Sequence, residues 1–204
     1  MHLAHIDALL ATHRPESPPN RPGLRRAAVA IILRERTGRD PETEILFIRR
    51  AEKPGDPWSG HMAFPGGHVD REDASMLETA RRETLEEIGL DLAADGRHLG
   101  CLAHHEVTPR GRPIEMLIVP HVFAVPHDDV ELRANHEVAE IVWTPLDPIV
   151  RGSNHTTEDR IIGGAATTFD GYRVNGGHFV WGLTYRILNA FFAVLDPSRN
   201  SPAG

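Results

Sequence analysis

The stretch Arg82-Glu83-Thr84-Leu85-Glu86-Glu87-Ile88-Gly89-Leu90 carries most of the information in this chain of 204 residues. Each residue of an α-helix turns by about 100°, so the glutamates at positions 83, 86 and 87 become neighbours on one surface. The opposite side of the same helix carries Leu77, Thr84, Leu85 and Ile88, with Ala80 at the border. The pattern predicts a helix with one acidic face.

Glu83, Glu86 and Glu87 repel one another at this spacing, and late in a helix they also oppose the macrodipole. A hard divalent cation compensates for such a cluster, because Mg²⁺ prefers carboxylate oxygens and often shares its ligand shell with substrate phosphates. The sequence therefore predicts a site for Mg²⁺ or Mn²⁺, two ions that oxygen ligands do not separate. The alternative is a solvated acidic face, but glycines on both sides of the helix, in Pro65-Gly66-Gly67 and at Gly89, favour a site.

The helix is predicted to run from about residue 73 to residue 88. Asp73 is a suitable N-cap, because its side chain can accept a hydrogen bond from the first turn. Gly89 stands where a left-handed residue ends a helix.

The rest of the chain alternates short apolar segments with turns. Strands are predicted at residues 26–34, 44–50, 61–64, 100–103, 114–125 and 138–143, the first two as a hairpin. Helices are predicted at residues 1–13, 145–150 and 178–195, and a loop at residues 163–177. This order indicates an α/β (α+β) layered domain rather than a doubly wound parallel sheet. We divide the chain into an N-terminal helix with a proline-rich arm (1–25), the main domain (26–197) and a disordered tail (198–204).

Composition excludes several classes of protein. The formal charge of −7 disfavours a nucleic acid polymer as partner, because such binding depends on neutralising phosphates. The sequence has no run of about 18 apolar residues, so we expect no membrane-spanning helix. The N-terminus lacks the pattern of a secretion signal. Cys101 is the only cysteine, which excludes an internal disulfide and is typical of a reducing, cytoplasmic location.

Residues 67–90 resemble the Nudix box, a glycine followed by a helix that ends Arg-Glu-x-x-Glu-Glu-x-Gly-x. The matching positions are Arg82, Glu83, Glu86, Glu87, Gly89 and Leu90. This chain departs from the pattern at Thr84, where an aliphatic residue is usual, and in a spacing from Gly67 to Arg82 that is one residue longer. The longer spacing puts Ala74 where the family has an early glutamate, with Asp73 and Glu72 beside it.

The resemblance implies a fold and a set of roles. The fold is a Nudix-like α/β/α sandwich with a mixed β-sheet between helices. Glu83, Glu86 and Glu87 are implied as metal ligands, and Arg82 as the residue that orients a glutamate. A further catalytic glutamate is implied before a later strand, for which Glu137 is the candidate.

The sequence before the box resembles the Nudix branch that contains coenzyme A diphosphatases. The resemblance rests on residues 44–67, which end in Phe64-Pro65-Gly66-Gly67, and on Trp181-Gly182-Leu183-Thr184. The loop at residues 54–58 lacks the basic residue expected there. The substrate-binding candidates are Arg49, Arg50, Gly66, Gly67 and Trp58. The alternatives are a solvated strand end for the two arginines and simple loop packing for Trp58.

These observations predict metal-dependent hydrolysis of a phosphoanhydride bond in a small nucleotide-like substrate, with coenzyme A or a derivative as the implied compound. Glu86, Glu87 and Glu137 are the candidate bases. The alternatives are a Nudix pyrophosphatase for ADP-ribose, dinucleoside polyphosphates or oxidised nucleoside triphosphates, a non-catalytic nucleotide sensor, and an interaction protein with an acidic helix. A homodimer is compatible with the sequence, in which the N-terminal helix docks on a second copy.

Overall fold

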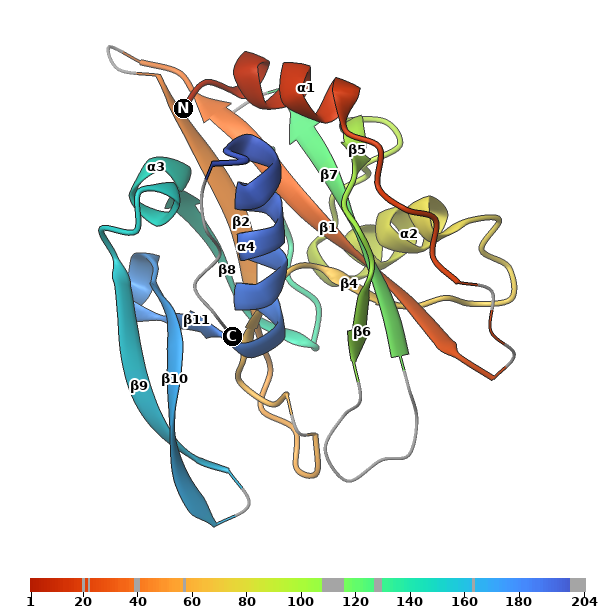
Figure 1. Ribbon diagram of the computed structural model, residues 1–204. Coiled ribbons are helices and arrows are strands. Elements are labelled where there is room, and N and C mark those ends of the chain that lie inside the picture. Colours follow the sequence, from red (N-terminus) through yellow and green to blue (C-terminus); the bar gives the residue numbers. More distant parts are fainter. Residues whose placement is uncertain are drawn as a thin grey trace.

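The computed structural model describes residues 1–19, 21, 23–38, 41–56, 58–107, 116–126, 130–162 and 164–198. Figure 1 shows a central sheet with helices on both sides and a separate hairpin at one edge. The elements, in chain order, are α1 (Leu3–Thr12), β1 (Arg25–Arg36), β2 (Glu42–Arg50), β3 (Met62–Ala63), β4 (Gly66–His68), α2 (Met76–Ile88), β5 (Arg97–Cys101), β6 (His105–Val107), β7 (Met116–Val125), β8 (Val138–Pro145), α3 (Leu146–Val150), β9 (His155–Ile162), β10 (Ala165–Arg173), the 3-10 turn Asn175–Gly177, β11 (Phe179–Trp181) and α4 (Gly182–Leu195).

The central sheet is mixed, as predicted. Its strand order is β3-β2-β1-β7-β5, with β4 paired to β1, β6 to β7 and β8 to β2. Strands β1 and β7 are parallel over the whole length of β7, whereas the other pairs are antiparallel. The predicted hairpin of β1 and β2 is confirmed by pairs such as Leu33 with Ile45.

Strands β1 and β2 stay paired only at the hairpin end. Beyond it β1 pairs with β4 and β2 pairs with β3, so the chain from Met62 to His68 lies between the two diverging strands. Pro65 is part of this insertion, and its carbonyl accepts a hydrogen bond from the Ala30 amide (2.8 Å). The glycine loop is thereby held by backbone pairing on both sides.

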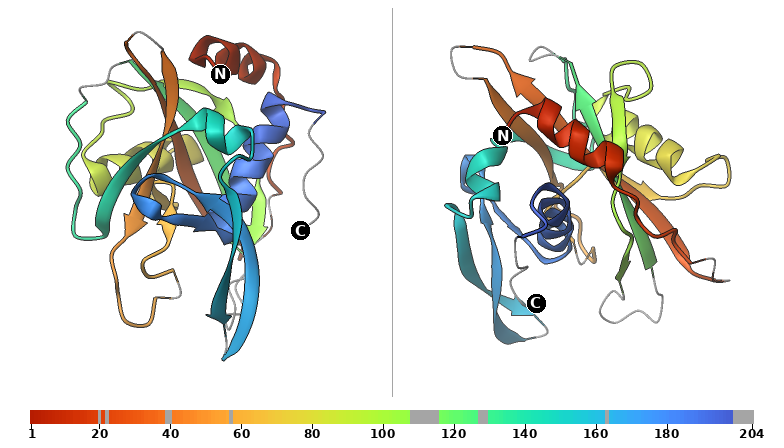
Figure 2. Two further views of the ribbon diagram at one scale, coloured as in Figure 1. Left: turned by 90° about the vertical axis from the view of Figure 1, so that its left-hand side faces the viewer. Right: turned by 45° about the horizontal axis from the view of Figure 1, so that its top comes forward.

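Side chains that alternate along β1 divide the core into two layers. Ile31 and Leu33 belong to a large apolar cluster with α1 and α4, whereas Ala30 and Ile32 belong to a smaller one beneath α2. Figure 2 shows α2 on one face of the sheet and α1 and α4 on the other. The α/β/α sandwich is therefore confirmed. In the described residues, no helix is long and apolar enough to cross a bilayer.

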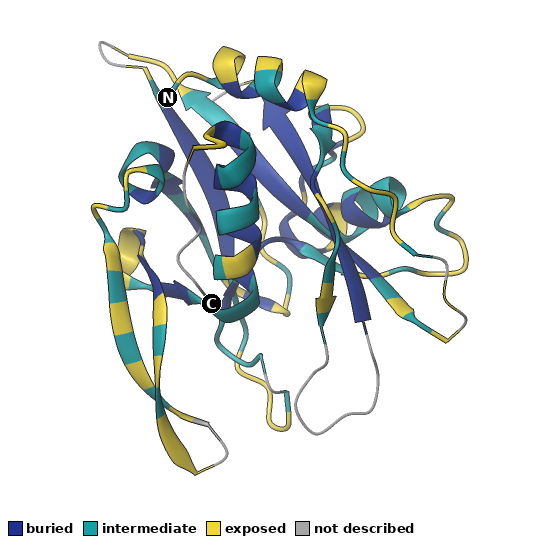
Figure 3. Ribbon diagram, in the orientation of Figure 1, coloured by how far each residue is buried: buried dark blue, intermediate teal, exposed yellow. Residues whose placement is uncertain are grey.

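The prediction of a loop at residues 163–177 is wrong for most of that length. Strand β10 occupies Ala165–Arg173 and pairs with β9 in a long hairpin, which β11 extends to three strands. Much of the hairpin is exposed, as Figure 3 shows, so it lacks the alternation of apolar and polar residues that predicts a half-buried strand. The final helix begins at Gly182 rather than at residue 178, because Phe179–Trp181 pairs with β10.

Three further predictions concern the N-terminal helix, the start of β7 and the C-terminal tail. The N-terminal helix is confirmed, and Ile6 and Leu10 are buried in the large core cluster. The predicted strand at residues 114–125 is observed from Met116 onward, and its first two residues lie outside the described part. The predicted tail also lies outside it, apart from Ser198.

Candidate active site

Glu87 is the buried member of the acidic trio. Its side chain projects from the last turn of α2 and is only 3% exposed. Its Oε2 accepts a hydrogen bond from the Gly66 amide (2.9 Å). Gly66 itself has φ 151°, and a side chain there would meet the Ala28 carbonyl at 2.3 Å, so only glycine fits this position.

Glu83 lies against the second glycine of the loop. A methyl group added at Gly67 would stand 2.4 Å from the Glu83 carboxylate carbon. The absent side chain therefore provides the space for this carboxylate. Gly66 and Gly67 have different tasks, because the first supplies an amide donor and the second leaves room.

Arg82 connects the acidic residues around it. It forms a bidentate pair with Asp73, with both nitrogen to oxygen distances 2.9 Å, and donates to Oε1 of Glu83 at 2.9 Å. Longer contacts of 3.4 Å reach both oxygens of Glu86, and Nη2 donates to the His68 carbonyl (3.0 Å). The guanidinium thus links the start of α2, its acidic face and the glycine loop.

Two sequence predictions about this helix are wrong. The N-cap is Ser75, whose side chain accepts from the Glu78 amide, because the Asp73 carboxylate is occupied by Arg82 and Thr79. Leu85, placed on the same side as Ile88, is 48% exposed, whereas Glu87 is buried. The end of the helix at Gly89 is confirmed by a left-handed φ of 72°.

Burial and mutual repulsion raise the pKa of two glutamates. Burial raises the pKa of Glu87 to about 7, and the charges of Glu83 and Glu137 add to the shift. Burial also raises the pKa of Glu83, against the opposing effect of Arg82. Glu86 is different, because its side chain is 55% exposed. The described arrangement therefore keeps two carboxylates where their negative charge is costly.

Of the segment at residues 130–137, the sequence assigned only Glu137 to the site. The Arg133 and Asn135 amides donate to the Ile88 and Glu87 carbonyls (2.8 and 2.9 Å), so the segment caps the C-terminal end of α2. Glu137 is anchored through its backbone, and its side chain remains half exposed. Its charge is close enough to raise the pKa of both Glu83 and Glu87, which places it beside the trio.

The predicted substrate residues do not all reach the same place. Arg49 is turned to Glu140 (3.4 Å). Arg50 pairs with Asp56 (2.9 Å) and lines a cavity of about 330 Å³ next to the glycine loop. Gly66, Gly67 and Trp58 line the same cavity. The structure thus brings four of the five candidates together and leaves Arg49 apart.

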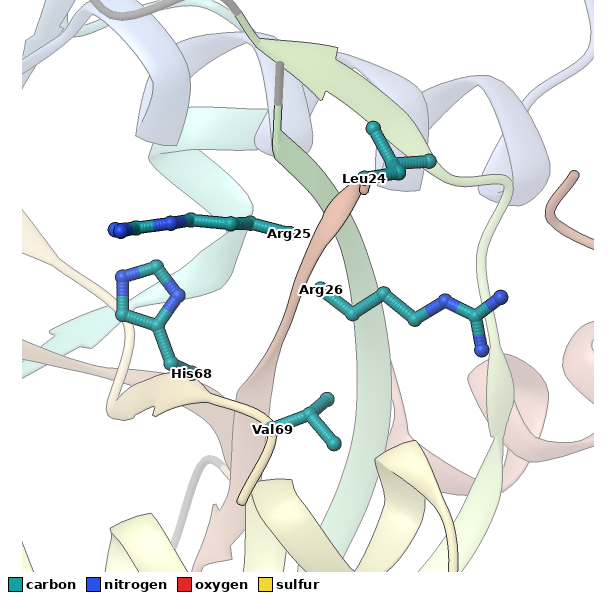
Figure 4. Close-up of a pocket in the computed structure, with 5 residues that line it drawn as sticks. All are labelled: Leu24, Arg25, Arg26, His68 and Val69. Atoms are coloured by element: carbon teal, nitrogen blue, oxygen red, sulfur yellow. The ribbon is translucent and has the colours of Figure 1, made fainter. Parts of the chain in front are cut away.

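A second, shallower hollow of about 420 Å³ adjoins the first through His68, which lines both. In Figure 4 the side chain of Arg25 extends beside the His68 ring, whereas Arg26 points the other way. Arg25 forms no ion pair with any other described residue. The glycine loop therefore borders one mainly apolar cavity and one basic surface.

The donor set fits a divalent cation. Carboxylate oxygens are the preferred ligands of Mg²⁺ and Mn²⁺. A buried carboxylate whose pKa is raised by its acidic neighbours is stabilised when a cation binds. Within the described ranges, no three carboxylate, imidazole or thiolate side chains are placed so that together they could hold a metal ion. Of the three candidate ligands, Glu86 is the most exposed, and its carboxylate contacts Arg82.

Two known proteins are similar to more than two thirds of this chain. An uncharacterized protein of Schizosaccharomyces pombe is 35% identical over 153 residues, which cover 68% of this chain and 46% of that protein. Mitochondrial coenzyme A diphosphatase NUDT8 of Homo sapiens is 31% identical over 160 residues, which cover 78% of this chain and 65% of that protein. The chain therefore spans less than two thirds of the length of either relative.

The structural and family comparisons point the same way. A MutT/nudix family protein from Enterococcus faecalis has a similar crystal structure, with a TM-score of 0.55 at 19% identity over 96% of this chain and 75% of that one. This similarity concerns the fold alone. The NUDIX domain family model matches residues 24–162, which is more than half of the sequence. On this match, and on the glycine loop and acidic helix described above, the chain belongs to the Nudix domain family.

Proposed function

We propose that this protein is a metal-dependent hydrolase that cleaves a phosphoanhydride bond in a small nucleotide-like substrate. The observation that carries the proposal is the placement of Glu83 and Glu87 against the glycine pair, where burial and repulsion raise the pKa of both carboxylates. Folding alone gains nothing from placing the buried Glu87 and the partly buried Glu83, two acids of like charge, side by side. A bound cation would offset the repulsion between the two carboxylates and would attract an anionic substrate.

Glu83, Glu86 and Glu87 would hold the metal, Mg²⁺ or Mn²⁺. When bound, such an ion acts as a Lewis acid that neutralises charge on the diphosphate oxygens. Arg82 holds Glu83 and contacts Glu86, so it restricts the orientation of both carboxylates. The Gly66 amide does the same for Glu87.

A carboxylate of this chain would take a proton from the attacking water, as general bases do in hydrolysis. The candidates are Glu86, Glu87 and Glu137. Glu86 and Glu137 are about half exposed, so solvent reaches both of them. Glu137 stands on a segment that is joined to the end of α2 by backbone hydrogen bonds, which keeps it close to the trio.

Coenzyme A or a derivative is the substrate we propose. The support is the name of the human relative together with the apolar cavity that adjoins the glycine loop. Products would be 4′-phosphopantetheine and adenosine 3′,5′-bisphosphate. The predicted cytoplasmic location and the possible homodimer stay predictions, and the human relative is named as mitochondrial.

The test is product analysis by mass spectrometry after incubation with Mg²⁺ and a panel of coenzyme A, ADP-ribose, a dinucleoside polyphosphate and an oxidised nucleoside triphosphate. Glu86→Gln and Glu87→Gln are each expected to lower kcat by about 10² to 10³, the usual cost of removing one electrostatic contact in a transition state. Glu78→Gln is the matched control, because Glu78 lies on the same helix and pairs with Arg81.

Hydrolysis of another compound in the panel would replace coenzyme A as the substrate and leave the reaction class intact. Near-normal rates in both Glu86→Gln and Glu87→Gln would overturn the metal site. Tight binding of a nucleotide without any product would favour the sensor.

A further inference from the structure

The hollow at the start of β1 presents a cationic side chain that the acidic helix does not use. Arg25 is exposed, and its side chain extends beside the ring of His68, which is also exposed (Figure 4). Neither side chain has an ion pair or a hydrogen bond with another residue that the structure describes. Two groups that can donate hydrogen bonds therefore face about 420 Å³ of space without an acidic partner among the described residues.

Arg25 differs in this respect from the arginines at the far end of the same strand. Arg34 pairs with Glu44 (2.7 Å), and Arg36 pairs with Glu42 (3.3 Å). The charge of Arg25 is not offset in this way, so it can attract an anion from solution. A guanidinium suits a phosphate group in particular, because it can donate two parallel hydrogen bonds to phosphate oxygens. An imidazole beside it adds a further ring N–H donor.

The hollow lies close to the glycine loop. His68 lines both this hollow and the cavity beside the loop, and it stands opposite Ala27 on β1, whereas Gly66 stands opposite Val29. From Gly66 to His68 the strand spans about 7 Å, because each residue of a strand advances by about 3.3 Å. The 5′ and 3′ phosphate groups of one ribose are separated by a similar length. A nucleotide with its diphosphate at the glycine pair would therefore carry a 3′-phosphate to this hollow.

We propose that Arg25 and His68 form a subsite for a second phosphate group of the substrate, carried on the 3′ position of its ribose. The inference rests on the proposed function and adds two specificity-determining residues to it. Coenzyme A has such a group, whereas 3′-dephospho-coenzyme A and ADP-ribose do not. Arg25 lies outside the acidic helix and the glycine loop, so we expect it to act on binding and not on the chemical step.

The first test measures binding by calorimetry in the presence of Mg²⁺. Adenosine 3′,5′-bisphosphate and adenosine 5′-monophosphate differ only in the 3′-phosphate, and neither contains a phosphoanhydride bond that could be hydrolysed. The native protein is expected to bind the bisphosphate at least about tenfold more tightly, as a hydrogen bond to a charged group typically contributes. Arg25→Ala is expected to lose this preference. Arg25→Lys is expected to keep part of it, because an ammonium retains the charge and loses the paired donors.

The second test compares coenzyme A with 3′-dephospho-coenzyme A in turnover. Arg25→Ala is expected to raise KM for coenzyme A about tenfold with little change in kcat, as when a contact made equally in the ground and transition states is removed. The values for the dephospho compound are expected to stay the same. Arg36→Ala is the matched control, because Arg36 is an exposed arginine at the opposite end of β1. Both substitutions are on the surface, so we expect the fold to survive.

The outcomes separate this inference from the proposed function. A preference for the bisphosphate that Arg25→Ala removes, without hydrolysis of any diphosphate, would support the subsite while the proposed reaction fails. Hydrolysis of coenzyme A with the same dependence on the 3′-phosphate in native protein and Arg25→Ala would overturn the subsite and leave the reaction intact. Equal binding of the two nucleotides, or binding of neither, would also overturn it. So would inorganic phosphate that displaces the bisphosphate at equal concentration, because the hollow would then be a general anion site.

Discussion

Helices α2 and α4 lie on opposite faces of one sheet and are built for different purposes. The buried side of α4 consists of Thr184, Ile187, Leu188, Phe191, Phe192 and Leu195. The buried side of α2 consists of Thr79, Ala80, Thr84, Glu87 and Ile88. One helix buries large apolar side chains at helical spacing, whereas the other buries a single large apolar side chain, that of Ile88, beside small or polar ones and a carboxylate.

The difference shows where stability and function reside. The threonines of α2 satisfy their hydroxyls within the molecule, Thr84 on the Ala80 carbonyl (2.7 Å) and Thr79 on Asp73 (2.8 Å). They nevertheless contribute less apolar burial than the phenylalanines of α4. We infer that α4 stabilises the domain, and that α2 gives up stability to keep its carboxylates beside the glycine loop.

The largest expected effect is on the α4 side of the comparison. Phe192→Ala removes a fully buried ring and is expected to lower the free energy of unfolding by about 3–5 kcal/mol, measured by urea denaturation. Leu85→Ala on α2 is the control, with an expected change within about 0.5 kcal/mol because Leu85 is half exposed. Equal losses in the two variants would contradict the division of tasks.

In the glycine loop, effects on activity and on folding can be separated by substituting two adjacent residues. Gly67→Ala adds a methyl group that collides with the Glu83 carboxylate, which is the far end of a side chain and not backbone, so we expect the fold to survive and kcat to fall by about 10². Gly66→Ala collides with the Ala28 backbone and needs a strained φ, so it is expected to impair folding itself. Thermal unfolding and kcat, measured on both variants, check this. If Gly67→Ala is fully active, Glu83 does not need its present position.

A smaller effect is expected from Asp73→Asn at the start of α2. The change removes the charge that holds Arg82, and we expect a loss of about 2 kcal/mol in unfolding free energy, typical of a hydrogen-bonded charged group. Glu78→Gln breaks only a more exposed ion pair with Arg81 and is expected to cost less than about 1 kcal/mol. Similar values for both variants would show that the Arg82 network contributes no more than a surface pair.

The last expected effect depends on pH, is at most about 1.4 kcal/mol over one pH unit, and lies at the sheet edge near α2. Burial lowers the pKa of His121 from 6.5 to about 4, and its Nδ1 lies 3.2 Å from Nε2 of His98. The unfolded chain takes up this proton below pH 6.5 and the folded chain does not until about pH 4. The unfolding free energy therefore falls as pH falls through this window, by at most about 1.4 kcal/mol per pH unit for one proton.

His121→Leu is expected to flatten the decline in stability between pH 6.5 and pH 4, as measured by denaturation at several pH values. His136→Leu is the control, because the His136 side chain is 89% exposed. A slope that is unchanged in His121→Leu would show that His121 does not contribute to the pH dependence.

Much of the fold was accessible from local sequence patterns. The β-branched run of β1 and the glycine at position 89 identify their structures through short-range sterics. The β9–β10 hairpin was missed because its pairing places many polar residues in solvent, which leaves no apolar period to detect. Strand β11 was absorbed into the final helix because its apolar residues continue without a break into α4.

The candidate site was predictable in its composition and not in its arrangement. The spacing of Glu83, Glu86 and Glu87 places them on neighbouring positions of a helix. Which of them is buried depends on the Gly66 amide and on residues 130–137, contacts that are distant in the sequence. The partner of Arg82 is Asp73, nine residues upstream, which the sequence suggested only as an N-cap and as a neighbour of the expected early glutamate.

The central claim is that α2 keeps Glu87 buried for a cation at the expense of stability. It is tested most directly by thermal unfolding of the native protein and Glu87→Gln at pH 8, each with and without Mg²⁺. We expect the variant to have the higher Tm without Mg²⁺, because it no longer buries a charge, and Mg²⁺ to raise the Tm of the native protein only. A lower Tm in the metal-free variant, or an equal Mg²⁺ shift in both proteins, would contradict this account.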